Sequence, residues 1–162
     1  MSKFTFRIAK PLFDSLQAHL FPGDGDEHGA VIAVGIGQSS RESRLLAREV
    51  FLARDGIDYV ESKFGYCALS ADFVARVSDH CARRGLGYFA VHCHGGRDSV
   101  GFSPVDLESH QRGYPALLDI TNGGPVGALV FARNAVAGTI WTHNGVFDLD
   151  NLVVAVGGLK MG

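Results

Sequence analysis

A short apolar segment that ends in two histidines constrains this chain more than any other feature. Residues 88–94 are apolar up to His92-Cys93-His94, and such a run favours a buried strand. Residues two apart on a strand project from the same face, so His92 and His94 place their imidazoles side by side while Cys93 points away from them. A glycine-rich loop follows directly. The sequence therefore predicts that polar groups gather where this strand ends.

A helix start comes next, at Ser103-Pro104-Val105-Asp106. Serine at the cap, proline at the first position and an acid at the third are ordinary features of a helix N-terminus. Read alone, Ser103 and Asp106 are helix caps. Beside the two histidines, however, Asp106 could supply a third metal ligand. Two imidazoles and one carboxylate leave a fourth tetrahedral position open for water, which is the arrangement of a catalytic zinc site.

The rest of the chain predicts one α/β domain over residues 1–162, because this length suits a single core and no repeat or linker divides it. We expect a mixed β-sheet flanked by helices. Apolar alternation and continuous apolar runs predict strands at 4–8, 29–36, 45–54, 88–94, 126–132, 136–142 and 152–156. Helical spacing predicts helices at 11–20, 71–84 and 103–118, with a loop over 55–70.

Charge and composition exclude several classes of partner. The formal net charge is −2 and the pI is about 6.4, so the basic field that nucleic acid or an anionic membrane would need is missing. No stretch approaches 18 apolar residues, and the N-terminus lacks a signal-peptide core. We expect a cytoplasmic protein. The cysteines, at odd count and irregular spacing, predict reduced thiols and not disulfides: Cys67, Cys81 and Cys93.

An acidic, turn-rich loop ends in Glu27, just before the predicted strand at 29–36. Glu27 is therefore the carboxylate expected at the start of this strand, with Asp24 and Asp26 in the same loop as its alternatives. Two more distant glutamates are expected to be solvated surface charges, Glu49 and Glu61.

Other polar residues close to the proposed site in sequence are expected to have surface or packing roles. They are Asp98, Glu108 and His110. His110 follows Asp106 by one helical turn, so it could instead orient a ligand. On a late strand, Trp141 is expected in the core and His143 at the surface. Cys93, despite its place between the histidines, is expected to be a buried structural thiol and not a nucleophile.

The order Glu27, His92-x-His94 and Ser103-x-x-Asp106 resembles the JAMM family, the JAB/MPN (Mov34-like) zinc metalloproteases. The stretches Gly101–Ser103 and Tyr114-Pro115 are similar to bacterial members of this family. Two features depart from the family pattern without removing a ligand. Gly95 stands where many relatives have proline, and the loop from His94 to Ser103 is one residue longer than the commonest spacing. The resemblance implies the JAMM fold, with a cytidine-deaminase-like layout.

The resemblance also implies an activity, that of an isopeptidase which releases ubiquitin-like proteins from conjugates or precursors. His92, His94 and Asp106 would hold one Zn²⁺ with a bound water. Glu27 would take a proton from that water, and Ser103 would support the oxyanion. The implied substrate is the C-terminal tail of a ubiquitin-like modifier or its conjugate. A ubiquitin-activating-type enzyme would act in the same pathway, in a bacterial ubiquitin-like or antiphage conjugation system.

Two other functions deserve comparison with this expectation. The family includes domains that have lost the metal and act as scaffolds or binding modules, but this chain keeps the full set of ligand residues. A zinc deaminase acting on nucleobases needs an HxE and a PCxxC signature. Both signatures are absent from the sequence.

Overall fold

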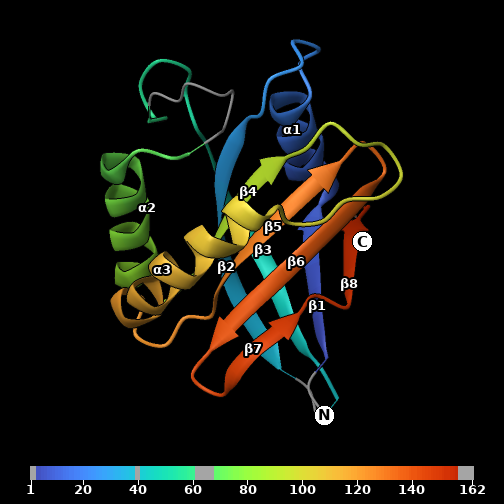
Figure 1. Ribbon diagram of the computed structural model, residues 1–162. Coiled ribbons are helices and arrows are strands. Elements are labelled where there is room, and N and C mark those ends of the chain that lie inside the picture. Colours follow the sequence, from blue (N-terminus) through green and yellow to red (C-terminus); the bar gives the residue numbers. More distant parts are fainter. Residues whose placement is uncertain (1–2, 39–40, 61–67, 157–162) are drawn as a thin grey trace.

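A computed structural model describes residues 3–38, 41–60 and 68–156. In that part of the chain, eight strands form one mixed, curled sheet with three helices against it (Figure 1). The strands are β1 Phe4–Ala9, β2 Gly29–Gln38, β3 Ser43–Leu52, β4 Gly87–Cys93, β5 Val126–Ala132, β6 Ala135–Thr142, β7 Gly145–Asp148 and β8 Asn151–Ala155. The helices are α1 Lys10–Leu20, α2 Ala71–Arg84 and α3 Pro104–Ile120.

The strand order is β7-β6-β5-β4-β2-β3-β1-β8. Strand β1 runs parallel to β3 and β8, and β4 runs parallel to β5, while the other pairs are antiparallel. The edge strands β7 and β8 are joined by only Leu149 and Asp150. The backbone N–H of Leu149 donates to Gly138 of β6, and that of Asp150 donates to Phe4 of β1. The short connection therefore requires the two sheet edges to approach each other, which gives the sheet its curl.

Two apolar cores lie on the two faces of this sheet. The first is enclosed by the curl and by α1, whose buried side chains are Leu16 and Leu20. The second lies beneath α2 and α3. Strand β4 contributes to both because its side chains alternate, with Cys93 in the first core and Tyr88 in the second.

The predicted mixed sheet flanked by helices is confirmed, and the predicted strands and helices match the observed ones to within a few residues. Helix α2 has the predicted bounds and ends at Gly85, whose φ of +66° is the left-handed conformation that glycine adopts readily. One strand was missed. Strand β7 has four mostly exposed residues, which is too short for a periodic apolar pattern. Glu61 and Cys67, named in the sequence predictions, lie outside the described residues.

The helices of the described segments are all too short or too polar to cross a bilayer.

Candidate metal centre

Strand topology brings three distant segments together at one end of β4. Because β4 and β5 are parallel and α3 connects them, the N-terminus of α3 lies near the carboxyl end of β4. Strand β2 runs antiparallel to β4, with Gly29 opposite His92. Extending this register by two residues places Glu27 opposite His94. The predicted site residues therefore come from a loop, a strand end and a helix start that meet at one sheet edge.

Three ligand atoms form a nearly equilateral triangle at this edge. His92 Nε2 lies 3.2 Å from His94 Nε2 and 3.2 Å from Asp106 Oδ2, and His94 Nε2 lies 3.3 Å from Asp106 Oδ2. In a tetrahedral zinc site with bonds of about 2.0–2.1 Å, ligand atoms are about 3.3–3.4 Å apart. The triangle therefore has the size and the nitrogen and oxygen donors that one face of such a site requires.

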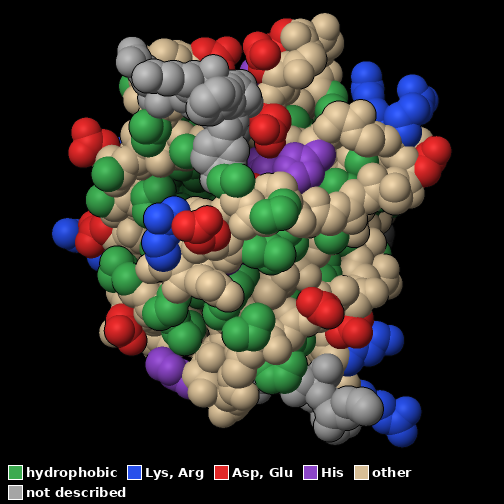
Figure 2. All heavy atoms as spheres, viewed as in Figure 1, with side chains coloured by type: hydrophobic (Ala, Val, Ile, Leu, Met, Phe, Trp, Pro, Cys, Tyr) green, Lys and Arg blue, Asp and Glu red, His purple; other side chains and the backbone are tan. Residues whose placement is uncertain are grey.

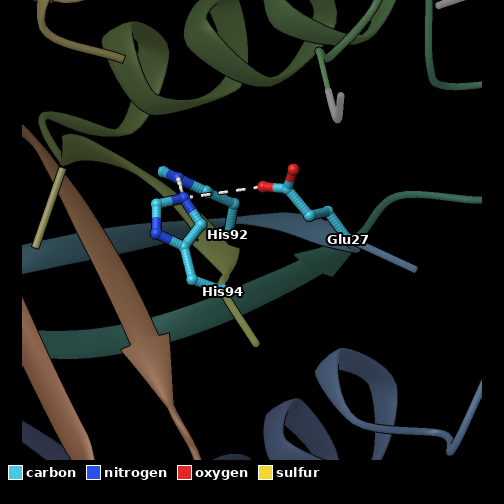
Figure 3. A group of neighbouring side chains, drawn as sticks. All are labelled: Glu27, His92 and His94. Carbon is cyan, nitrogen blue, oxygen red and sulfur yellow. Dashed lines mark hydrogen bonds and ion pairs between the residues drawn. The ribbon is translucent and has the colours of Figure 1, made fainter. Parts of the chain in front are cut away.

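Glu27 reaches the same place from the other side. Its Oε1 lies 3.6 Å from His94 Nε2, and Figure 3 shows its carboxylate pointing toward the imidazole rings. The ligand atoms of Glu27, His92 and His94 all lie within 4.8 Å of one another, so this group could hold a metal ion. Asp106 is closer to both histidines than Glu27 is to His94, which makes Asp106 the better third ligand and leaves Glu27 beside the triangle.

The cap and ligand interpretations of Asp106 are compatible, because one oxygen serves both. Ser103 Oγ accepts a hydrogen bond from the Asp106 backbone N–H at 3.1 Å, and Asp106 Oδ2 accepts one from the Ser103 backbone N–H at 2.9 Å. This pair is a capping box. Oδ2 is also the oxygen that faces the two histidines. The helix cap thus orients the carboxylate toward the candidate metal position, as partners of ligands commonly do.

The two carboxylates of the site have opposite electrostatic environments. Burial raises the pKa of Glu27, and the neighbouring His92 and His94 only partly oppose this effect. Burial also tends to raise the pKa of Asp106, but the hydrogen bonds that it accepts from His92 and Ser103, with its electrostatic interaction with His92, lower it far more. The surroundings thus favour the ionised form of Asp106, as suits a ligand, and disfavour the ionised form of Glu27.

The two alternatives to Glu27 are placed differently. Asp24 pairs with His28, and Asp26 is exposed, with its backbone N–H donating to Asp24. The surface roles expected for more distant acids are confirmed by ion pairs and hydrogen bonds at the surface. These are Glu49 with His80, Asp98 with Asn134 and Glu108 with Arg112.

His110 has the packing role expected for it. It is 7% exposed and makes edge-on ring contacts with Phe102, Tyr114 and Trp141. Its Nδ1 has no hydrogen-bond partner in the part of the chain that the structure describes. Trp141, expected in the core, is half-buried and packs against it. His143 is exposed as predicted, but it lies in the turn after β6 and not on the strand.

Cys93 is buried on the face opposite the histidines, which confirms its predicted structural placement. Burial raises the pKa of its thiol, which argues against a thiolate nucleophile. Sequence reasoning missed His28, which is 5% exposed and directly follows Glu27. Its place after the leading base candidate was a signal, but a histidine ending an acidic, turn-rich loop is expected at the surface.

Two cavities adjoin the centre. One, of about 240 Å³, is bordered by His92 and Asp106 and extends between α2, α3 and the sheet to Tyr114. The other, of about 360 Å³, is bordered by Glu27 and His94 and by the loops around them. Figure 2 shows histidine side chains at the surface on this side of the molecule, with acidic and apolar side chains near them. The centre is thus accessible and has open space on both sides.

Comparison with known proteins assigns this chain to no family. No family model matches the sequence, and no curated protein matches it. Among solved structures, the chain is similar to the solution structure of protein DSY2949 from Desulfitobacterium hafniense. The two share 11% sequence identity with a TM-score of 0.49, over 93% of this chain and 94% of that chain.

Proposed function

We propose that this chain is a zinc-dependent isopeptidase or peptidase of the JAMM type, acting at the C-terminal tail of a ubiquitin-like modifier. The observation that carries the proposal is the triangle of His92 Nε2, His94 Nε2 and Asp106 Oδ2 with Glu27 beside it. These residues occur in the order of the family motif. In the folded chain, they also come close enough to act on one ion.

The donor set suits zinc. His92, His94 and Asp106 would hold the ion through two nitrogens and one oxygen. Bound zinc supplies Lewis-acid polarisation of a carbonyl and lowers the pKa of water to about 7. One ion per chain is expected.

Glu27 would act as the proton carrier. Its raised pKa suits a group that accepts a proton from water as the water oxygen adds to the amide carbon. As the C–N bond breaks, Glu27 returns this proton to the leaving amine. Ser103 Oγ, which accepts the capping hydrogen bond, keeps its own hydrogen available to donate to the oxyanion. No covalent enzyme intermediate is needed, so Cys93 can remain a structural thiol.

The family resemblance suggests the substrate class, and the open space beside the centre supports it. Cavities on both sides of the centre leave room for an extended polypeptide that continues in both directions from the cleaved bond. The flexible tail of a ubiquitin-like modifier, joined to a partner protein, has that form. A ubiquitin-activating-type enzyme in a cytoplasmic pathway would then supply the conjugates.

The test uses a ubiquitin-like modifier fused through its C-terminal tail to a reporter protein. Zinc-loaded wild type should cleave at the tail, and the chelated protein should not. Glu27→Gln should lose at least about a hundredfold in rate while retaining one zinc per chain. Glu49→Gln, in a surface glutamate paired with His80, is the matched control and should cleave like wild type.

Cleavage that survives chelation or Glu27→Gln would contradict this mechanism. Purified protein with far less than one zinc per chain and no cleavage would instead favour the scaffold alternative.

A further inference from the structure

The loop that carries Glu27 has little structure of its own. It contains Gly23 and Gly25, both with positive φ, and space for a Cβ is open around each of them. Glycines increase the conformational freedom that must be lost when a loop is ordered. Glu27 nevertheless has to stay within a few ångströms of His94. Something outside the loop must therefore hold it.

A single sulfur atom joins the two ends of this loop. Cys93 Sγ donates to the backbone carbonyl of Leu20 at 3.1 Å and accepts from the backbone N–H of His28 at 3.3 Å. Leu20 is the last residue of α1, and His28 directly follows Glu27. Cys93 is 3% exposed, so water does not compete for these hydrogen bonds. The two ends of the loop are thus held together by a side chain of β4 that lies in the first core.

A second contact ties the tip of the loop to the same base. His28 Nε2 lies 2.8 Å and 3.0 Å from the two carboxylate oxygens of Asp24. Asp24 also accepts from the backbone N–H of Asp26 at 3.0 Å. The His28 ring is buried and packs edge-on against His19 of α1, with ring centroids 5.8 Å apart. The exposed tip is therefore linked through one buried ring to the helix.

We propose that Cys93 and the Asp24–His28 pair are positioning residues that hold Glu27 at its working distance from the metal centre. This inference rests on the proposed function, in which Glu27 is the general base. His92 and His94 flank Cys93 in the chain and project from the opposite face of β4. The end of β4 thus places the metal ligands on one face of the sheet, while Cys93 on the other face holds the loop that carries Glu27.

The experiment compares Cys93→Ala, Cys93→Ser and Asp24→Asn with a matched control, Cys81→Ala. Cys81 is also a buried thiol, but it lies in α2 in the second core. Amide hydrogen exchange is measured over residues 21–28 in the zinc-loaded proteins, together with zinc content, kcat and KM on the modifier fusion. Asp24 lies at the surface, so Asp24→Asn gives a reading even if a core variant folds poorly.

Cys93→Ala and Asp24→Asn should speed exchange at residues 21–28 and lower kcat about tenfold or more, with KM and zinc content near wild type. Cys93→Ser retains a donor and an acceptor and should recover part of the loss. In a Glu27→Gln background, Cys93→Ala should cause no further fall in kcat. Cys81→Ala should reduce stability without changing exchange in the loop.

Unchanged exchange at residues 21–28 in Cys93→Ala and Asp24→Asn would overturn the proposal. The proposal would also be overturned if Cys93→Ala lowered kcat by the same factor in the wild type and in the Glu27→Gln background. Faster loop exchange in these variants, with no cleavage by any of the proteins, would have two consequences. It would support the role of Cys93 and the Asp24–His28 pair in holding the loop, and it would overturn the proposed function.

Discussion

At the scale of single residues, the two buried histidines nearest the centre differ in how well their polar atoms are satisfied. His28 has a carboxylate partner in Asp24, whereas His110 Nδ1 has none among the described residues and lies in an aromatic cluster. A buried polar atom without a partner costs about 1–3 kcal/mol. The His110 ring therefore fills space in the aromatic cluster, while its Nδ1 makes no hydrogen bond within the described residues.

His110→Phe should raise the free energy of unfolding by about 1 kcal/mol at pH 7.5, because it removes the unpaired atom and keeps a ring of similar shape. Burial lowers the pKa of His110 by more than the nearby Asp106 carboxylate raises it. The unfolded chain takes up a proton at this position below about pH 6.5, and the folded chain does so only at lower pH. The free energy of unfolding of the wild type therefore falls as the pH drops below about 6.5. The stability advantage of His110→Phe over the wild type should be larger at pH 5.5 than at pH 7.5.

Urea unfolding of both chelated proteins at pH 7.5 and 5.5 measures this difference. His143→Gln, at an exposed histidine, is the control substitution. A His110→Phe advantage that stayed constant between the two pH values would show that His110 titrates normally in the folded protein.

At the scale of elements, α2 and α3 begin in the same way but with different consequences. Each has a serine N-cap whose side chain accepts from the third helical residue, Ser70 from Phe73 and Ser103 from Asp106. Only the second cap holds a candidate metal ligand. The two helices therefore provide a matched pair that separates helix stability from metal binding.

Ser70→Ala and Ser103→Ala should each lower the free energy of unfolding of the chelated protein by about 1 kcal/mol, the usual effect of losing an N-cap. Ser103→Ala alone should also weaken zinc binding, by about tenfold. The Asp106 backbone N–H loses its bond to Ser103 Oγ, so the first turn of α3 holds the carboxylate less firmly, although the bond from the Ser103 backbone N–H to Asp106 Oδ2 stays. Chemical unfolding and competition with a chromophoric chelator measure the two effects. Equal zinc affinity in the two variants would mean that the Ser103 side chain does not help to orient the Asp106 carboxylate.

At the scale of the whole molecule, a bound ion would connect the end of β4 to the start of α3. These segments are separated by a glycine-rich loop that includes Gly95, Gly96 and Gly101. A ligand that binds only the folded state stabilises it in proportion to the logarithm of its concentration. Zinc should therefore raise the stability of the entire fold.

At a free zinc concentration one hundred times its Kd, the added stability should be about 2.7 kcal/mol. For a chain of 162 residues this corresponds to a rise in Tm of about 5–10 °C. Thermal unfolding with zinc and with chelator measures it, and His92→Ala should unfold at the same temperature in both. A wild-type Tm that did not respond to zinc would argue against a metal centre in the folded protein.

The sequence alone determined most of the elements and the local part of the site. Strand and helix periods are properties of the backbone, so within the described residues apolar spacing located the three helices and every strand except the short β7. The same geometry placed His92 and His94 on one face and Cys93 on the other. The serine, proline and acid at the start of α3 likewise predicted a cap before any packing was known.

Only the tertiary structure decided which of these groups meet. Glu27 comes opposite His94 through the pairing of β2 with β4, and Cys93 binds His28 across 65 positions of sequence. The burial of His28 and the turning of Asp106 Oδ2 toward both histidines also depend on how separate segments pack. Local patterns record the preferences of neighbouring residues, whereas the distance between remote side chains is set by the register of the sheet and the closure of its core.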